Sequence, residues 1–223
     1  MSTPTPRAAR ARAAAKHRTP EPSPRTKVLP IVALVVVGLI AVGIALLSGG
    51  GDDSDDGGTA LSTAEVTVRG EALPPLGDGQ DPAVGTPAPE LEGVSVDGTP
   101  TNVEPAGRPT LLAFLAHWCP HCQAELPRLV DLADAGELDD LRAVAVLTGT
   151  DESRPNFPPG EWIEDEGWEG EVLLDDADQP AAAAYGLSSY PFLVLLDADG
   201  NVVARSAGEL GMEGLEVFLA QLD

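Results

Sequence analysis

One segment of this 223-residue chain carries both of its cysteines: Leu111-Leu-Ala-Phe-Leu-Ala-His-Trp-Cys-Pro-His-Cys-Gln-Ala-Glu-Leu-Pro127. The run from Thr110 to Leu115 is apolar and of strand length, as expected for a strand that is buried on both faces. The stretch from Pro120 to Ala135 has apolar residues at helical spacing and ends near Gly136. The two cysteines therefore lie where a buried strand passes into a helix.

The placement of the cysteines favours redox chemistry. Cys119 is predicted at the helix N-terminus, where unpaired N–H groups and the positive end of the helix dipole favour a thiolate. Pro120 takes the first helical position, where its fixed φ suits the turn. Cys122 lies one turn further, close enough to attack a mixed disulfide at Cys119. His121 also favours the thiolate, and because a stabilised thiolate makes a disulfide more oxidising, this dipeptide favours an oxidant or isomerase.

Two other roles for the cysteine pair receive less support. A structural disulfide across two intervening residues closes a loop too short to restrict the unfolded chain much. A metal site would draw on His117, Cys119, His121 and Cys122, but no further His or Cys follows Cys122 to complete a cage. We therefore expect a redox-active disulfide between Cys119 and Cys122, no metal and no dissociable cofactor.

The rest of the C-terminal part alternates strand and helix patterns. We expect a hairpin across residues 94–103, further strands at 141–147, 172–174, 192–196 and 202–205, and helices near 161–166, 178–185 and 212–222. A piece with alternating apolar residues, 64–68, either adds an edge strand or has no regular structure. This order of elements predicts an α/β sandwich with a mixed sheet.

Charge and hydropathy divide the chain into contrasting parts. Residues 1–27 carry seven Lys and Arg against one acid, whereas the chain from Val28 onward carries six Arg against 35 acids. Between the two lies the apolar run 28–47, long enough to cross about 30 Å of hydrocarbon at ~1.5 Å per residue. The basic flank predicts a cytoplasmic N-terminus and an extracytoplasmic C-terminal part. The formal net charge of −23 argues against binding of nucleic acid.

We therefore expect four parts. These are a disordered basic cytoplasmic tail (1–27), a transmembrane helix (28–47), a flexible acidic linker rich in Gly, Asp and Pro (48–84), and a folded domain (85–223). A cleaved signal peptide is the alternative for the apolar run, but a signal core of ~7–15 residues is shorter. The prediction is a single-pass protein of the cell membrane whose catalytic domain is extracytoplasmic.

The segment 111–127 resembles the active-site strand and helix of the thioredoxin superfamily. More closely, it resembles the membrane-anchored extracytoplasmic thiol–disulfide oxidoreductases of the TlpA/ResA type. Pro127 corresponds to a proline in that family's active-site helix, and residues 186–200 match its cis-proline loop, strand and hairpin. The resemblance covers residues 85–223 and implies a thioredoxin-like three-layer sandwich, preceded here by the transmembrane helix.

The resemblance also implies roles for individual residues. The Tyr190–Pro191 peptide bond is expected to be cis and to lie beside the cysteines, with Trp118, Tyr190 and Pro191 binding substrate. Many thioredoxins have a buried acid six residues before the first cysteine, and Ala113 stands at that position here. Glu125 is the nearest candidate for proton transfer with the second cysteine, the alternative being a solvated helix residue. We expect His117 to be exposed at the strand end.

The implied reaction is thiol–disulfide exchange with protein thiols or disulfides, with a redox partner in the membrane. The Pro-His dipeptide favours oxidation of secreted proteins. The family resemblance favours reduction, for example of apocytochrome c thiols before haem attachment. A hypothesis of another class is a non-catalytic module that carries a metal on thiol ligands or serves in docking.

Overall fold

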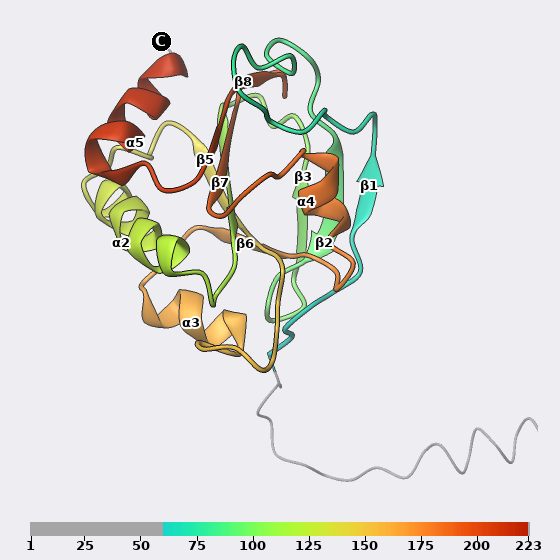
Figure 1. Cartoon of the computed structure of the whole chain (residues 1–223), viewed down its shortest axis with the longest axis vertical. Helices are drawn as coiled ribbons and strands as arrows, with labels where there is room; N and C mark the ends of the chain where they lie inside the picture. The colour runs from blue at the N-terminus through green and yellow to red at the C-terminus, as the bar shows by residue number, and fades with distance from the viewer. Residues whose placement is uncertain (1–59, 223) are drawn as a thin grey trace, which may run out of the picture. The chain divides into compact units, whose positions relative to one another are not determined.

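The computed structural model describes residues 60–222 (Figure 1). The predicted basic tail, the predicted transmembrane helix and the first part of the predicted linker lie outside the described residues. Within residues 60–222, no helix combines the length and the apolar composition that crossing a membrane requires.

The secondary structure of residues 60–222 follows the predicted order, with most element boundaries within about two residues of the prediction. The elements in chain order are β1 (Thr67–Arg69), β2 (Glu90–Val94), β3 (Pro100–Val103), β4 (Thr110–Leu115), α2 (Pro120–Asp134), β5 (Arg142–Leu147), α3 (Pro159–Asp165), β6 (Glu171–Leu174), α4 (Pro180–Ala184), β7 (Phe192–Leu196), β8 (Val202–Ala207), α5 (Gly211–Leu219) and the short 3-10 helix η2 (Ala220–Leu222).

A five-stranded sheet with strand order β6-β5-β4-β7-β8 forms the centre of the domain. Strands β4, β5 and β6 pair in parallel, whereas β7 pairs antiparallel with both β4 and β8. The sheet is therefore mixed, as predicted. All six residues of β4 are buried, because this strand lies in the middle of the sheet with both faces covered.

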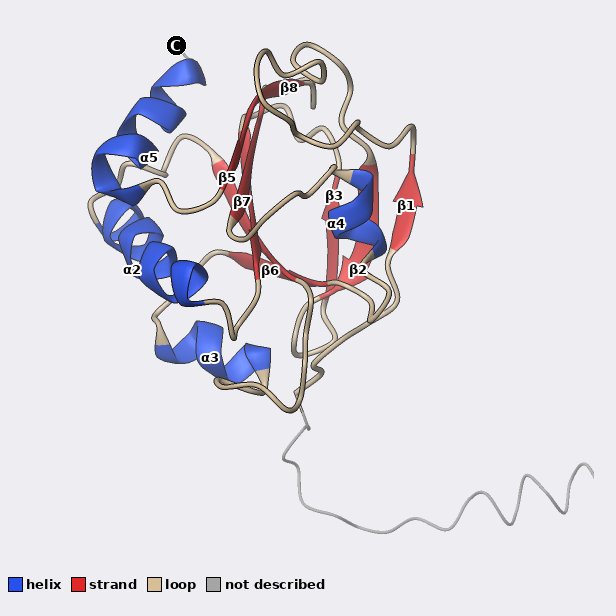
Figure 2. Cartoon of the chain, viewed as in Figure 1, coloured by secondary structure: helices blue, strands red, loops and turns tan. Residues whose placement is uncertain are grey.

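Helices and a second sheet cover the two faces of the central sheet (Figures 1 and 2). Side chains alternate along β4, so Leu111, Ala113 and Leu115 pack in the hydrophobic cluster of α2, α3 and α5. Leu112 and Phe114 pack in a second cluster, with α4 and the antiparallel sheet β1-β2-β3. The prediction of a three-layer sandwich is confirmed for the described residues.

The predicted linker differs from the structure over residues 60–84. Strand β1 pairs with β2 and so adds an edge strand, and Val66, Leu73 and Ala83 are buried in the second cluster. These few apolar side chains dock the segment onto the domain although Gly, Asp and Pro surround them. The folded domain therefore includes residues 60–84, and the predicted boundary at residue 85 lies too far along the chain.

Candidate active site

Cys119 lies at the N-terminus of α2, as predicted. It is the N-cap residue of the helix, with extended backbone angles of φ −79° and ψ 120°, and Pro120 is the first helical residue. Its N–H donates to the carbonyl of Ala116 over 2.9 Å, and its Sγ lies 4.0 Å from the carbonyl oxygen of Tyr190. This geometry places the sulfur at the positive end of the helix, beside the loop that contains Pro191.

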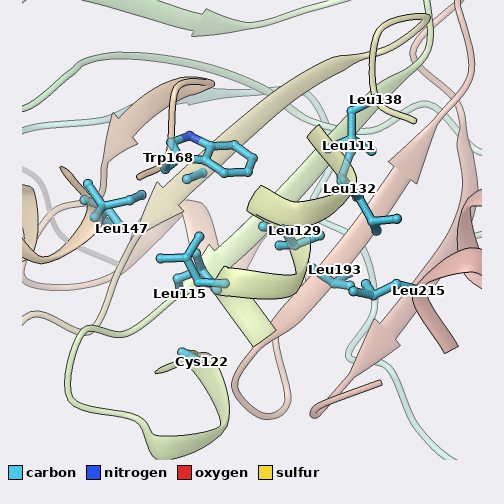
Figure 3. Packing of buried hydrophobic residues seen from close by; sticks show 14 of the residues in the cluster. Leu111, Leu115, Cys122, Leu129, Leu132, Leu138, Leu147, Trp168, Leu193 and Leu215 are labelled. Carbon is cyan, nitrogen blue, oxygen red and sulfur yellow. The ribbon is translucent and has the colours of Figure 1, made fainter. Parts of the chain in front are cut away.

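Cys122 lies one turn further along α2 and is fully buried. Its exposed fraction is 0%, against 6% for Cys119, and it belongs to the hydrophobic cluster shown in Figure 3. The Ala116 N–H donates to its Sγ over 3.4 Å. Burial raises the pKa of the Cys122 thiol far above its ordinary value, and charge at Cys119 and Glu125 acts in the same direction. Both cysteines are free thiols in the structure.

The contrast between the two thiols predicts selective alkylation. When the fully reduced chain is treated with iodoacetamide at neutral pH, we expect one label to be taken up rapidly at Cys119. The second label should follow only when the protein unfolds, because Cys122 is inaccessible and burial keeps it protonated. Peptide mass spectrometry of timed samples measures this order. Equal labelling rates at the two cysteines would contradict it.

The residues predicted to bind substrate meet around Cys119. The Tyr190–Pro191 peptide bond is cis, as the resemblance implied. The Tyr190 ring packs edge-on against Trp118, with 5.9 Å between ring centroids, and its hydroxyl donates to Gln179 Oε1 over 2.8 Å. The Trp118 Nε1–H donates to the Gly149 carbonyl over 2.7 Å. These contacts fix the two aromatic side chains beside the cysteine.

His121 points away from the core and pairs with a residue that sequence reasoning missed. Its side chain is 66% exposed, and its Nδ1 lies 2.9 Å from Glu209 Oε2. A groove of about 510 Å³ opens at this point and is lined by His121, Ser189, Tyr190, Gly208, Glu209, Leu210 and Gly211. No local pattern could have identified Glu209, because 88 positions separate it from His121.

Glu125 is buried, so the alternative of a solvated helix residue is wrong. Its carboxylate accepts hydrogen bonds from the N–H groups of Leu210 and Gly211, over 2.8 and 3.1 Å, and from Arg128 over 2.8 Å. The helix periodicity indicates that Glu125 is buried, because it lies three residues after the buried Cys122 and one before the buried Leu126. Glu125 thus holds the N-terminus of α5 against α2.

His117 is buried, which corrects the expectation that it is exposed. Its Nδ1 lies 2.7 Å from the Pro155 carbonyl, and its Nε2 lies 3.2 Å from the Asp151 N–H. One ring nitrogen therefore donates and the other accepts, as in a neutral imidazole. The loop 149–158 covers the strand end, which the sequence patterns did not indicate. Among residues 60–222, no group of three or more His, Cys, Asp or Glu side chains is placed to hold a metal ion.

Arg154 is a second residue near the site that sequence reasoning missed. Its guanidinium stacks over the Trp118 ring, 4.5 Å from the ring centroid. The contact is a cation–π interaction on an exposed surface, where such contacts are worth about 0.5–1 kcal/mol. It adds to the contacts that hold the Trp118 ring.

Comparison with known proteins identifies the family. The family described as Redoxin matches residues 83–217. The chain belongs to the Redoxin family. Of the curated relatives, the methylamine utilization protein MauD of Methylophilus methylotrophus is 32% identical over 127 residues, which cover 56% of each chain. The thiol-disulfide oxidoreductase ResA of Bacillus anthracis is 26% identical over 141 residues, or 62% of this chain and 78% of ResA. The chain thus spans little more than half the length of the MauD relatives.

A solved structure supports the fold assignment of this Redoxin family member. The thioredoxin domain of a thiol-disulfide oxidoreductase from Bacteroides vulgatus superposes with a TM-score of 0.51 and 22% sequence identity, covering 61% of this chain and 98% of that domain. The thioredoxin-like fold is therefore confirmed. The resemblance to ResA-type redoxins, stated from the sequence alone, is confirmed by the family match and by ResA itself.

Proposed function

We propose that this Redoxin family member is a thiol–disulfide oxidoreductase that acts on protein substrates through Cys119 and Cys122. The observation that carries the proposal is the difference between the two thiols: one lies at a helix N-terminus next to a cis-proline loop, and the other is fully buried one turn behind it. Cys119, which keeps 6% of its surface exposed, can meet a substrate, and the fully buried Cys122 nearby can release it.

The exchange proceeds in two displacements. In the reducing direction, the Cys119 thiolate attacks a substrate disulfide, forms a mixed disulfide and expels one substrate thiolate. Cys122 then loses its proton and attacks Cys119 Sγ, which expels the second substrate thiolate and closes the Cys119–Cys122 disulfide. Two electrons pass to the substrate. In the oxidising direction, a substrate thiolate attacks Cys119 Sγ of the disulfide, and each step runs in reverse.

We propose that Trp118, Tyr190 and Pro191 bind the substrate next to Cys119. The two aromatic side chains are held by hydrogen bonds to Gly149 and Gln179, so they offer a fixed apolar surface. An extended substrate segment would lie along the backbone of Tyr190, whose carbonyl oxygen is 4.0 Å from Cys119 Sγ.

Glu125 is proposed to take part in the proton transfer at Cys122, since it carries a buried carboxylate on the same helix. Glu125→Gln should then slow the attack of Cys122 on a Cys119–glutathione mixed disulfide by roughly a hundredfold, the lower end of what a positioned acid or base contributes. Rapid mixing followed by acid quench and mass spectrometry measures the rate. Arg128→Met is the matched control, because it breaks the Glu125–Arg128 bond but keeps the carboxylate. Equal rates in Glu125→Gln and the wild type would exclude this role.

For the direction of electron flow we propose oxidation, on the strength of the Pro120-His121 dipeptide between the cysteines. Reduction is the second candidate, and it is favoured by the resemblance to the TlpA/ResA type and by the similarity to ResA. A reduction potential near −120 mV would support a strong oxidant, and one near −270 mV a reductant.

We also propose the setting of the domain. The apolar run 28–47 would anchor it in the cell membrane on the extracytoplasmic side, where a membrane redox partner would restore the active form of the cysteine pair. The supporting observations are the basic first 27 residues and the excess of acids beyond the apolar run.

The proposed function is tested by equilibrating the full chain with mixtures of reduced and oxidised glutathione. We expect Cys119 and Cys122 to pass together between dithiol and disulfide at a defined ratio, and the chain to catalyse exchange in a protein substrate such as reduced ribonuclease. A chain that retains zinc or copper through dialysis and catalyses no exchange would instead be a metal carrier. A chain that does neither would be a docking module.

A further inference from the structure

An ion-pair network runs from the core to the surface of the active site. Its members are Glu125, Arg128, Glu209 and His121. The Arg128 guanidinium donates to Glu125 over 2.8 Å and to Glu209 over 2.7 Å, and the other oxygen of Glu209 lies 2.9 Å from His121 Nδ1. Of these four residues, His121 alone lies between Cys119 and Cys122 in the sequence. Its ring therefore links the network to the redox centre.

The loop that carries Glu209 is fixed on both sides. Before it, the Gly208 N–H donates to the Pro191 carbonyl over 2.8 Å, and Gly208 has a φ of +89° that favours glycine. After it, the N–H groups of Leu210 and Gly211 donate to the buried Glu125. The Glu209 side chain is 27% exposed, so its carboxylate is held in place in front of His121.

Glu209 is ionised in this environment. The hydrogen bond from His121 lowers the pKa of the Glu209 carboxyl below its ordinary value, and the bond from Arg128 adds to the effect. An ionised carboxylate bonded to an imidazole fixes the orientation of the ring. It also stabilises a positive charge on the ring.

We infer that Glu209 is a positioning residue that strengthens the oxidising power of the cysteine pair by acting through His121. The inference rests on the proposed exchange reaction. A positive charge at His121 stabilises the Cys119 thiolate, and stabilising the reduced form makes the disulfide more oxidising. The Glu209 carboxylate holds the ring and stabilises a positive charge on it, because an opposite charge at hydrogen-bond distance favours the charged form. The cysteine pair therefore oxidises more strongly with Glu209 in place than without it. Glu209 therefore makes the Cys119–Cys122 disulfide a stronger oxidant of its substrates.

The test is the equilibrium of the full chain with glutathione, measured for the wild type and for Glu209→Gln. We expect the reduced form of Glu209→Gln to be favoured about tenfold less, which corresponds to a potential about 30 mV more negative. In a His121→Ala background the same substitution should leave the equilibrium unchanged, because the ring through which Glu209 acts is gone. Glu213→Gln removes an equal charge from an exposed site in the first turn of α5 and should shift the equilibrium by less than about twofold, since solvent and salt screen it.

The outcomes separate this inference from the proposed function. If wild type exchanges with glutathione but Glu209→Gln has the same potential, the role of Glu209 is refuted and the exchange reaction stands. The role is also refuted if Glu209→Gln shifts the potential equally with and without His121, because the carboxylate would then act on the cysteines directly. If wild type forms no Cys119–Cys122 disulfide at any glutathione ratio, the proposed function itself fails.

Discussion

Cys119→Ser is expected to reduce thiol–disulfide exchange to the uncatalysed background, and Cys122→Ser to stop it at the mixed disulfide. A hydroxyl cannot replace a thiolate as the attacking group, so the first variant loses the entry step. In the second variant, Cys119 still forms a bond to the substrate, but no sulfur stands behind it to release the product. Turnover assays with a reduced and with an oxidised protein substrate measure the loss, and non-reducing electrophoresis detects the trapped complex.

The pair of variants controls for folding as well as for chemistry. Serine differs from cysteine by one atom, and neither thiol is bonded to another sulfur in the structure, so both variants should melt close to wild type. Trapped substrate with Cys122→Ser but none with Cys119→Ser identifies Cys119 as the entry sulfur. The opposite pattern would reverse the two roles, and full activity in either variant would mean that the exchange does not use this pair.

The half of the domain around the cysteines could be predicted because its patterns are local. The apolar run of β4 and the helical spacing of α2 lie next to each other in the chain, so the strand-to-helix placement of Cys119 follows from sequence alone. The same periodicities also indicate that two polar residues of this region are buried. Alternation from Leu115 places His117 on the same side of the strand as α2, and Glu125 falls on the buried stripe of its helix.

The remaining features depend on contacts between distant segments. Glu209 faces His121 because the Gly208 N–H donates a hydrogen bond to the Pro191 carbonyl and because Glu125 accepts one from the first residue of α5. These contacts join segments far apart in the sequence, so no local pattern predicts them. The segment 60–84 has the average composition of a hydrated linker, because the average hides the three buried apolar side chains and the one buried ion pair that dock the segment onto the domain. Docking of this kind is decided by the surface that receives the segment, here β2, α4 and β8.

Asp81→Asn is expected to lower the free energy of unfolding by about 3–5 kcal/mol at neutral pH, the range for breaking one side of a buried ion pair. Arg205 on β8 is 0% exposed and Asp81 is 11% exposed at the side chain. The guanidinium donates to Asp81, and also to the carbonyls of Pro74 and Tyr185 over 2.9 and 2.7 Å. Asparagine keeps the shape of aspartate but leaves the buried charge of Arg205 without its partner. Urea unfolding followed by circular dichroism measures the loss.

The exposed pair of Arg69 and Glu92 supplies the matched control. Their side chains are 60% and 43% exposed, so Arg69→Met should cost no more than about 1 kcal/mol. Equal effects of Arg69→Met and Asp81→Asn would contradict the assignment of Arg205 as the anchor of the N-terminal segment.

Acid pH gives a second measurement on the same pair, because the hydrogen bond from Arg205 lowers the pKa of the Asp81 carboxyl below its ordinary value. A carboxyl group with a lowered pKa in the folded state stabilises the fold above its unfolded pKa of about 3.9. That stabilisation is lost as the pH falls through the lower, folded value. The difference in unfolding free energy between wild type and Asp81→Asn should therefore be constant near neutrality and shrink below about pH 4. A difference that persists unchanged into strong acid would mean that Asp81 acts by shape and not by charge.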